Sequence, residues 1–172
     1  RRSFLDGNEM CDNHRMQRFR ARQLGITIGD LPTGPRNAIS DVDGVRVGHT
    51  TLIEGDGPLV TGRGPVRTGV TVILPHPGNV YRSKVRAAVH TINGYGKACG
   101  FEQVRELGVI ESPIALAGTL NVPRVADALI DYAIAQNPDI GISTSSVNAV
   151  VGETSDAYLN DLQGRHVQKT HV

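Results

Sequence analysis

The sequence lacks several features on which whole classes of protein depend. It has no tryptophan, three phenylalanines and four tyrosines in 172 residues, which argues against base-stacking platforms and large aromatic interfaces. Its net charge is +1, a balance that calls for neither nucleic acid nor an anionic membrane. No apolar run approaches the length of a transmembrane helix. We therefore expect neither a nucleic-acid partner nor a membrane partner.

Cysteine is also scarce. Cys11 and Cys99 are the two cysteines, and neither has a second cysteine or a histidine at the spacing of a zinc site. Two cysteines are too few for a disulfide framework, which favours a reducing compartment. The basic N-terminal stretch lacks the apolar segment of a secretory signal. The sequence thus predicts a cytoplasmic protein without a metal or other cofactor.

Length and composition predict one α/β domain preceded by a tail. The chain is 39% hydrophobic and 20% charged, and its length suffices for a single core. Residues 1–20 hold five arginines and no apolar period, which predicts a flexible basic tail. Alternatively, Met16 is the natural start and the residues before it are an artefact of cloning or gene assignment. Residues 21–172 are predicted to form the domain.

Apolar runs between glycine- and proline-rich turns predict short strands and a few helices. We expect strands over residues 67–74, buried from Val70, over 114–117 and over 147–151. Helical spacing of apolar residues predicts a helix over 122–135 that covers these strands, a second amphipathic helix over 85–92 and a short one over 101–107. Together these elements predict helices packed on a sheet.

Polar side chains gather after the last predicted strand: Glu153, Thr154, Ser155, Asp156, Asn160 and Asp161. Rigid scaffolds often present their chemistry at such a point, but an Asx-rich turn explains the same residues without function. For Glu153 and Asp156 we expect capping or turn roles. Asn121 stands at the expected N-cap of the helix over 122–135, which explains it without substrate contact. Tyr95 is flanked by glycines, and its ring should be accessible.

Three stretches together resemble one enzyme family. VNAVVGETSDAYLND, residues 147–161, is similar to the VNPVVGE-x-NDGYLND signature of the P1 peptidases, the DmpA-type self-processing L-aminopeptidase/D-esterases and β-aminopeptidases. NAISDVDGVRVGHTT, residues 37–51, is similar to the opening signature of that family. NGYGK, residues 93–97, is similar to a loop that borders its substrate pocket. The resemblance runs from about residue 22 to residue 171.

The resemblance implies a fold and a reaction. The fold is a four-layered αββα sandwich of the ornithine acetyltransferase-like kind, incomplete without a β subunit cut from the same precursor. The new N-terminal serine of that subunit is the nucleophile, and its GxGTSSR-type segment does not occur in these 172 residues. The chain therefore resembles the α-subunit portion, which we expect to be inactive alone. The implied activity is serine-type, N-terminal-nucleophile hydrolysis of small peptides, amides or esters by a homo-oligomer.

The resemblance also implies site residues. Asn160 matches an asparagine that helps to stabilise the oxyanion of the tetrahedral intermediate, which makes it the predicted catalytic residue. Tyr95, Lys97 and Asn121 are the predicted substrate-binding residues. Lys97 stands where some members carry an acidic residue that pairs with the free amino group of the substrate, a pairing that lysine cannot make. Ala157 replaces a usual glycine, a change that matters if the position needs a positive φ.

Two other functions fit the same residues. One is a non-catalytic, α-like binding or assembly module. The other is an acyltransferase, since the related fold uses an equivalent covalent intermediate.

Overall fold

The computed structural model describes residues 19–172, and the chain separates into a first unit, residues 1–33, and a second, residues 34–172. The described part of the first unit contains one short 3-10 helix, Ala21–Leu24, which ends at Gly25 with a φ of 77°. Every described residue of this unit is exposed. Of the predicted tail, residues 1–18 lie outside the described residues, together with Cys11 and Met16. The tail and the single domain over 21–172 stay predictions.

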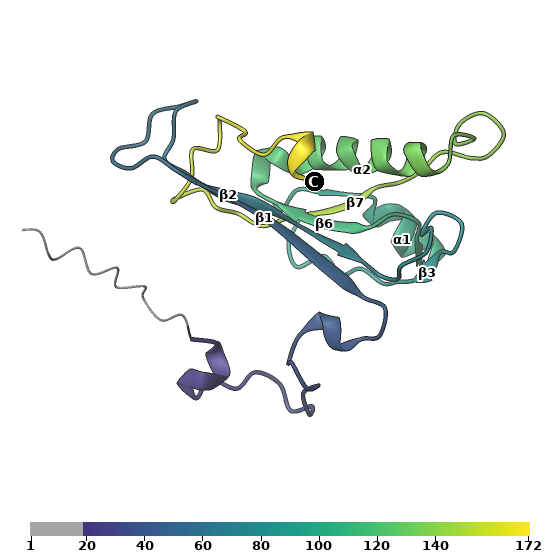
Figure 1. Cartoon of the computed structure of the whole chain (residues 1–172), viewed down its shortest axis with the longest axis horizontal. Helices are drawn as coiled ribbons and strands as arrows, with labels where there is room; N and C mark the ends of the chain where they lie inside the picture. The colour runs from purple at the N-terminus through teal and green to yellow at the C-terminus, as the bar shows by residue number, and fades with distance from the viewer. Residues whose placement is uncertain (1–18) are drawn as a thin grey trace, which may run out of the picture. The chain divides into compact units, whose positions relative to one another are not determined.

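The second unit is built on a five-stranded sheet (Figure 1). The strand order is β1-β2-β6-β7-β4, in which β6 and β7 are parallel and the other neighbours are antiparallel. The strands of this sheet are β1 Arg46–Glu54, β2 Val66–Leu74, β6 Ile114–Ala117, β7 Val150–Glu153 and β4 Ala98–Cys99. A two-stranded sheet joins β3 Val85–Arg86 to β5 Val109–Ile110. The helices are α1 Phe101–Leu107 and α2 Val122–Gln136, with 3-10 turns at Ile39–Asp41, Thr119–Asn121 and Lys169–His171.

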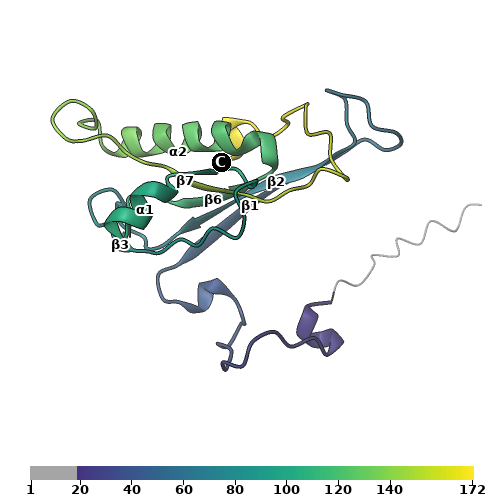
Figure 2. The same cartoon turned by 180° about the vertical axis from the view of Figure 1, so that it is seen from behind.

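Helix α2 covers one face of the sheet, as the two opposite views show (Figures 1 and 2). Apolar residues recur along α2 at helical spacing, and Pro123 suits the first turn because its missing N–H has no partner to lose there. Its buried side chains pack on those of the strands: Val122, Val125, Ala126 and Leu129 against Val70, Ala115, Ala117 and Val151. The predicted helix and the core beneath it are confirmed.

The opposite face of the sheet is only partly covered. Side chains alternate along a strand, so Thr71, Leu116 and Gly152, which stand opposite one another in the ladders, point away from α2. At one end of this face Ile114 and Val150 pack with α1 and the β3–β5 pair. Elsewhere the face is open, and the side chain of His49 on β1 lies exposed there. The α/β class is confirmed, while residues 19–172 form one large sheet of the sandwich rather than two.

The predicted helix over residues 85–92 is wrong. Val85 and Arg86 form β3, which pairs with β5, and the chain continues without helix to residue 92. Val85, Ala87 and Val89 alternate toward the smaller core, a period of two rather than 3.6. Ile92, which the helical spacing placed on the apolar face, is 90% exposed. Pairing with a distant strand therefore decides the conformation of this segment.

One predicted strand boundary and one predicted capping contact also need correction. The last strand begins at Val150, three residues later than predicted, and ends at Glu153, two residues later, because its parallel ladder pairs Val150 with Ile114 and Glu153 with Ala117. Asn121 does occupy the N-cap position of α2, but its side chain makes no capping hydrogen bond. The strand over 114–117 and the helix over 101–107 have the predicted bounds, and α1 ends at Gly108 with a φ of 64°.

Candidate active site

The site lies where β6 and β7 end side by side. Since the two strands are parallel, their carboxyl ends meet at one edge of the sheet, and the amide of Thr154 donates to the carbonyl of Ala117 at 2.8 Å. The turn that follows β6, Gly118 to Asn121, leads into α2, and the loop that follows β7 holds the predicted catalytic residue. Strand β2 continues beyond this edge. Its pairing with β6 stops at Val70, and residues 66–69 of β2 have no partner in β6.

Asn160 lies beside β2 past the point where β6 ends, and its side chain takes the position that a further β6 residue would occupy. Its side chain is 1% exposed, and its Oδ1 accepts the backbone N–H of Arg67 at 3.0 Å, as a strand carbonyl would. Its own N–H donates to the carbonyl of Asp156 at 3.1 Å. Among the described residues its buried Nδ2 has no acceptor. The predicted catalytic asparagine is therefore held by one side-chain atom and keeps the other as a spare donor.

Asp161 anchors this segment to the loop between β1 and β2. Its buried carboxylate accepts the N–H of Gly62 at 2.6 Å and that of Gly164 at 3.2 Å, and it pairs with His166 at 3.0 Å. Burial raises the pKa of Asp161, but His166 and the two amides outweigh it, so the pKa lies below its usual value. The signature drew attention to Asp161, whereas nothing in the motifs pointed to His166 as its partner.

Glu153 connects the predicted pocket loop to the end of β7. Its carboxylate accepts the hydroxyl of Thr119 and the backbone N–H of Lys97, each at 2.6 Å, and these bonds lower its pKa. The ammonium of Lys97 donates to the carbonyl of Tyr95 at 3.0 Å and lies 4.0 Å from the Tyr95 ring centre. Tyr95 is 86% exposed, as expected. Lys97 and Glu153 line a cleft of about 650 Å³, which Tyr95 does not line.

Buried polar side-chain atoms without a partner concentrate at the same edge of the sheet. In the part of the chain that the structure describes there are four: Thr68 Oγ1, Asn121 Oδ1, Asp156 Oδ1 and Asn160 Nδ2. Thr68 lies on β2 past its pairing with β6, Asn121 at the start of α2, and the other two in the loop after β7. Leaving one such atom unpaired costs about 1–3 kcal/mol, so four together indicate groups that meet a ligand or another segment.

Thr68 and Asp156 also line a second cleft, of about 410 Å³, on the open face of the sheet. His49, whose Nδ1 lies 2.9 Å from the Thr71 hydroxyl, borders the same cleft. Ala157, the departure from the family signature, is not among the non-glycine residues with positive φ in the described chain, which are Asn37 and Arg165. The usual glycine is therefore not required at that position.

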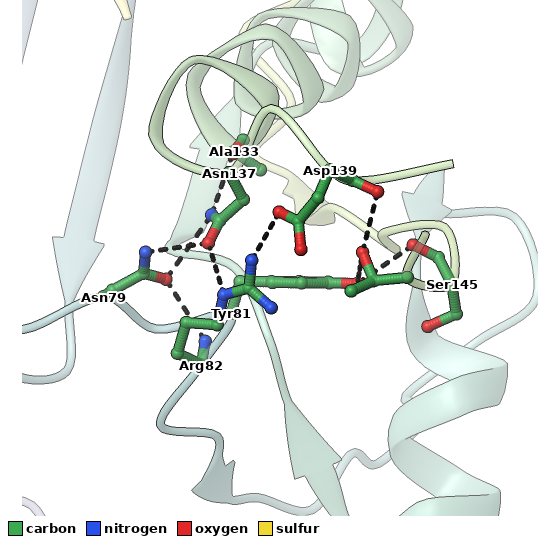
Figure 3. Close-up of polar contacts among 8 residues, drawn as sticks. Asn79, Tyr81, Arg82, Ala133, Asn137, Asp139 and Ser145 are labelled. Atoms are coloured by element: carbon green, nitrogen blue, oxygen red, sulfur yellow. Dashed lines mark hydrogen bonds and ion pairs between the residues drawn. The ribbon is translucent and has the colours of Figure 1, made fainter. Parts of the chain in front are cut away.

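The polar network at the other end of α2 has a structural role (Figure 3). Asn137 donates to the carbonyl of Ala133, which completes the last turn of the helix, and accepts from Asn79 and Arg82. Arg82 also pairs with Asp139 and lowers the pKa of that carboxyl group. The network joins the two loops at residues 79–82 and 137–145, and its hydrogen bonds are made within the network.

Residues 19–172 contain no group of three or more His, Cys, Asp or Glu side chains placed to hold a metal ion. In the same residues no helix has the length and apolar character needed to cross a membrane.

Comparison with known proteins finds one family and several solved relatives. The model of peptidase family S58 matches residues 37–172. The beta-peptidyl aminopeptidase BapA of Sphingosinicella xenopeptidilytica is 45% identical over 153 residues, which cover 89% of this chain and 37% of that protein. The chain therefore spans little more than a third of the length of this relative.

Solved structures of relatives are also similar to this chain, among them the two that follow. The PH0078 protein of Pyrococcus horikoshii superimposes with a TM-score of 0.84 at 53% identity, covering 90% of this chain and 44% of that one. The L-aminopeptidase D-Ala-esterase/amidase of Ochrobactrum anthropi, described as a prototype serine aminopeptidase and a variant of the Ntn hydrolase fold, has a TM-score of 0.72 at 35% identity. Here 89% of this chain matches 42% of that chain.

Proposed function

Because the chain belongs to peptidase family S58, we propose that it is the α-subunit portion of a self-processing aminopeptidase or amidase. In this proposal the chain supplies an oxyanion donor and part of the substrate pocket. The nucleophile is the N-terminal serine of a β subunit cut from the same precursor. The printed activities of the relatives, the beta-peptidyl aminopeptidase and the L-aminopeptidase D-Ala-esterase/amidase, support this class of reaction.

One observation carries the proposal: Asn160 has a buried amide nitrogen without an acceptor among the described residues. An N–H donor fixed in a water-poor site is suited to a negative charge that develops on a carbonyl oxygen. The bond from Arg67 to Oδ1 sets which end of the amide faces outward, since the accepting oxygen is already used. Such a donor requires no reorganisation when the oxyanion forms.

The chemical steps follow from this division. The serine hydroxyl attacks the acyl carbon of a small peptide, amide or ester, and the tetrahedral oxyanion receives the N–H of Asn160. The leaving amine or alcohol takes up the proton that the serine hydroxyl released, and water then hydrolyses the acyl-enzyme to the free acid and the free serine. The loop with Tyr95 and Lys97 is held on Glu153, and Lys97 and Glu153 line the cleft, whereas Tyr95 and Asn121, which stands at the start of α2, are not among its lining residues.

The open face and the edges of the sheet support a partner. Strands β1 and β4 are the edges of the five-stranded sheet, and unpaired edges and open faces are sites of association. We assign the open face to the β subunit of the same precursor, and we expect the complete protein to form a homo-oligomer. The isolated chain should then be poorly soluble.

The proposal is tested by comparing residues 1–172 with the same chain joined to the rest of its precursor. The isolated chain should show no acyl-enzyme burst and negligible hydrolysis of amino-acid p-nitroanilides. The complete protein should cut itself once and hydrolyse them. Robust hydrolysis by residues 1–172 would mean that the nucleophile lies in this chain. Acyl transfer to an amine in preference to water would assign an acyltransferase, and no reaction by the complete protein would leave a binding module.

A further inference from the structure

Asp161 and His166 form a polar pair beside Asn160 that the proposed chemical steps do not use. Asp161 is buried, and the Nε2 of His166 lies 3.0 Å from its Oδ2. An ionised carboxylate only accepts hydrogen bonds, so the ring nitrogen is the donor. The backbone N–H groups of Gly62 and Gly164 are its other donors. Among the described residues His166 is thus the one side chain that binds this carboxylate.

The backbone between the two residues brings them together. A Cβ placed on Gly164 would overlap both the Nε2 of His166 and the Oδ2 of Asp161. Gly164 is not among the glycines with positive φ, so the close approach of the pair, and not the backbone conformation, requires glycine here. Arg165 has a φ of 47°, in the left-handed region that non-glycine residues adopt only at a cost. Such strain persists where the surrounding contacts fix it.

Both chain neighbours of His166 are anchored to α2. The carbonyl of Arg165 accepts the guanidinium of Arg124 on α2, and the Nε of Arg165 donates to the carbonyl of Leu120 at 3.0 Å. Val167 is buried in the core that α2 covers, and its carbonyl accepts from Arg124 at 2.9 Å. His166 is therefore held on a rigid element, as a side chain must be in order to position another one.

Asp161 and Asn160 rest on the same short stretch at the start of β2. The N–H of Asp161 donates to the carbonyl of Pro65 at 3.0 Å, and the Oδ1 of Asn160 accepts the N–H of Arg67 at 3.0 Å. The carboxylate of Asp161 binds Gly62, in the loop that leads into this stretch. The carboxylate therefore fixes the loop beside the two backbone groups that hold residues 160 and 161. A shift of that loop moves the unpaired Nδ2 of Asn160.

The contact with His166 keeps the carboxylate in place. Burial raises the pKa of Asp161, and His166 with the amides of Gly62 and Gly164 brings it below its usual value. Without His166 the carboxylate would keep only the two amide donors among the described residues. A buried charge without a side-chain partner is costly, so the carboxylate would turn toward water or take up a proton. Either change loosens its contact with Gly62.

We propose that His166 is a positioning residue of this site: held on α2, it fixes the amide of Asn160 through Asp161 in the orientation that serves the oxyanion. The inference rests on the proposed function and adds to it a residue that the chemical steps do not name. In this role His166 contacts neither the substrate nor the reacting atoms, and it acts through Asn160. Displacing a catalytic group by about 1 Å can cost about 10²-fold in rate, so the position of the Nδ2 matters.

Three variants of the complete protein test this role. His166→Ala removes the donor to the carboxylate, whereas His166→Gln supplies an amide N–H at a similar reach. Gly164→Ala keeps both side chains of the pair and forces them apart. His76→Ala is the control, because His76 also holds its own loop, past the other end of β2. Its Nε2 lies 2.8 Å from the carbonyl of Ser83, and its Nδ1 accepts the N–H of Gly78 at 3.0 Å.

His166→Ala and Gly164→Ala should lower kcat for alanine p-nitroanilide by about 10- to 100-fold and keep KM within about twofold, because the oxyanion donor shifts and the cleft does not. His166→Gln should recover kcat to within about threefold of the wild type, since its amide donates to the carboxylate. His76→Ala should keep both constants. His166→Ala combined with Asn160→Ala should have the kcat of Asn160→Ala within about threefold, because a residue that acts through Asn160 adds nothing once that amide is gone.

Four results would overturn the inference. Unchanged kcat in both His166→Ala and Gly164→Ala would remove any role for the pair. Losses that multiply in the double variant would make His166 a contributor independent of Asn160. No recovery in His166→Gln would assign the loss to the volume of the ring. A loss in His76→Ala as large as that in His166→Ala would trace the effect to general stability.

Gly164→Ala, combined with Asn160→Ala in the same way, decides the question if His166→Ala does not fold. Two further results would instead contradict the proposed function: absence of hydrolysis by the wild-type complete protein, or full activity of Asn160→Ala alone.

Discussion

Replacing Asn160 with alanine removes two interactions that a matched control can separate. The change deletes the Oδ1 that accepts the N–H of Arg67 and the unpaired Nδ2 donor. Ser112 offers the control, because its buried hydroxyl accepts the N–H of Val150 at 3.0 Å in the same sheet. Ser112→Ala therefore leaves one strand N–H without its side-chain acceptor, as Asn160→Ala does, but it does not touch the proposed oxyanion donor.

The expected magnitudes differ between stability and catalysis. A buried N–H left without its acceptor costs about 1–3 kcal/mol, so both variants should lose a similar free energy of unfolding. For a protein of 150–250 residues 1 kcal/mol shifts the Tm by about 2–4 °C, and the longer complete protein should show a smaller shift. Loss of one oxyanion donor lowers kcat by about 10²–10³, and this loss should occur in Asn160→Ala alone. The mutation is thus not neutral for the fold, although the fold should survive it.

Thermal unfolding of the complete protein and steady-state hydrolysis of an amino-acid p-nitroanilide measure the two effects. Self-cleavage, followed on a gel, shows whether each variant matures. The reasoning fails if Asn160→Ala keeps kcat within about threefold of the wild type. It also fails if Ser112→Ala loses as much kcat as Asn160→Ala, because the kinetic loss would then follow from stability.

Three further predictions concern the surrounding contacts. Lys97→Glu brings a second carboxylate to Glu153, so kcat/KM for free-amine substrates should rise relative to N-acylated ones. Glu153 has a lowered pKa, so its contribution to stability is present above the unfolded pKa of about 4.3 and is lost as the pH falls through the folded pKa. Thr119→Ala removes the hydrogen bond that contributes most to the lowered pKa of Glu153. Titration of the carboxyl group followed by NMR should therefore give a higher Glu153 pKa, and the free energy of unfolding should fall less as the pH is lowered. Gly100→Ala should strongly lower the Tm, since φ is +76° and the new Cβ would lie 2.4 Å from the carbonyl of Ala149.

The elements that the sequence predicted well are those whose packing repeats locally. Residues 70–74 and 114–117 are mostly apolar, and both proved to lie in strands of the main sheet. Helix α2 has its apolar residues at helical spacing, and a single face of it meets the core. In these segments the period of burial can be read within the segment itself.

The segments that failed depend on partners far along the chain. Residues 85–92 carry helical spacing by coincidence, and β5, more than 20 residues later, holds the first of them in an extended ladder. Glu153 binds the amide of Lys97, 56 residues earlier, a contact that no local pattern contains. Polar residues that follow a strand predict a turn at Asp156, but that pattern carries no information on whether the carboxylate finds a hydrogen-bond donor in the folded chain.

Asn160 and the ladder beside it have a consequence for how this chain tolerates insertions and deletions. Apart from the contact of Gly62 with Asp161, the loop between β1 and β2 can change its length at the surface and leave the pairing of Val70 with Ala117 intact. A deletion of one residue between Arg67 and Val70 would instead move the strand by about 3.3 Å and turn the N–H of Arg67 to the other edge. Length variation within this short stretch should therefore be selected against even where every individual side chain is replaceable.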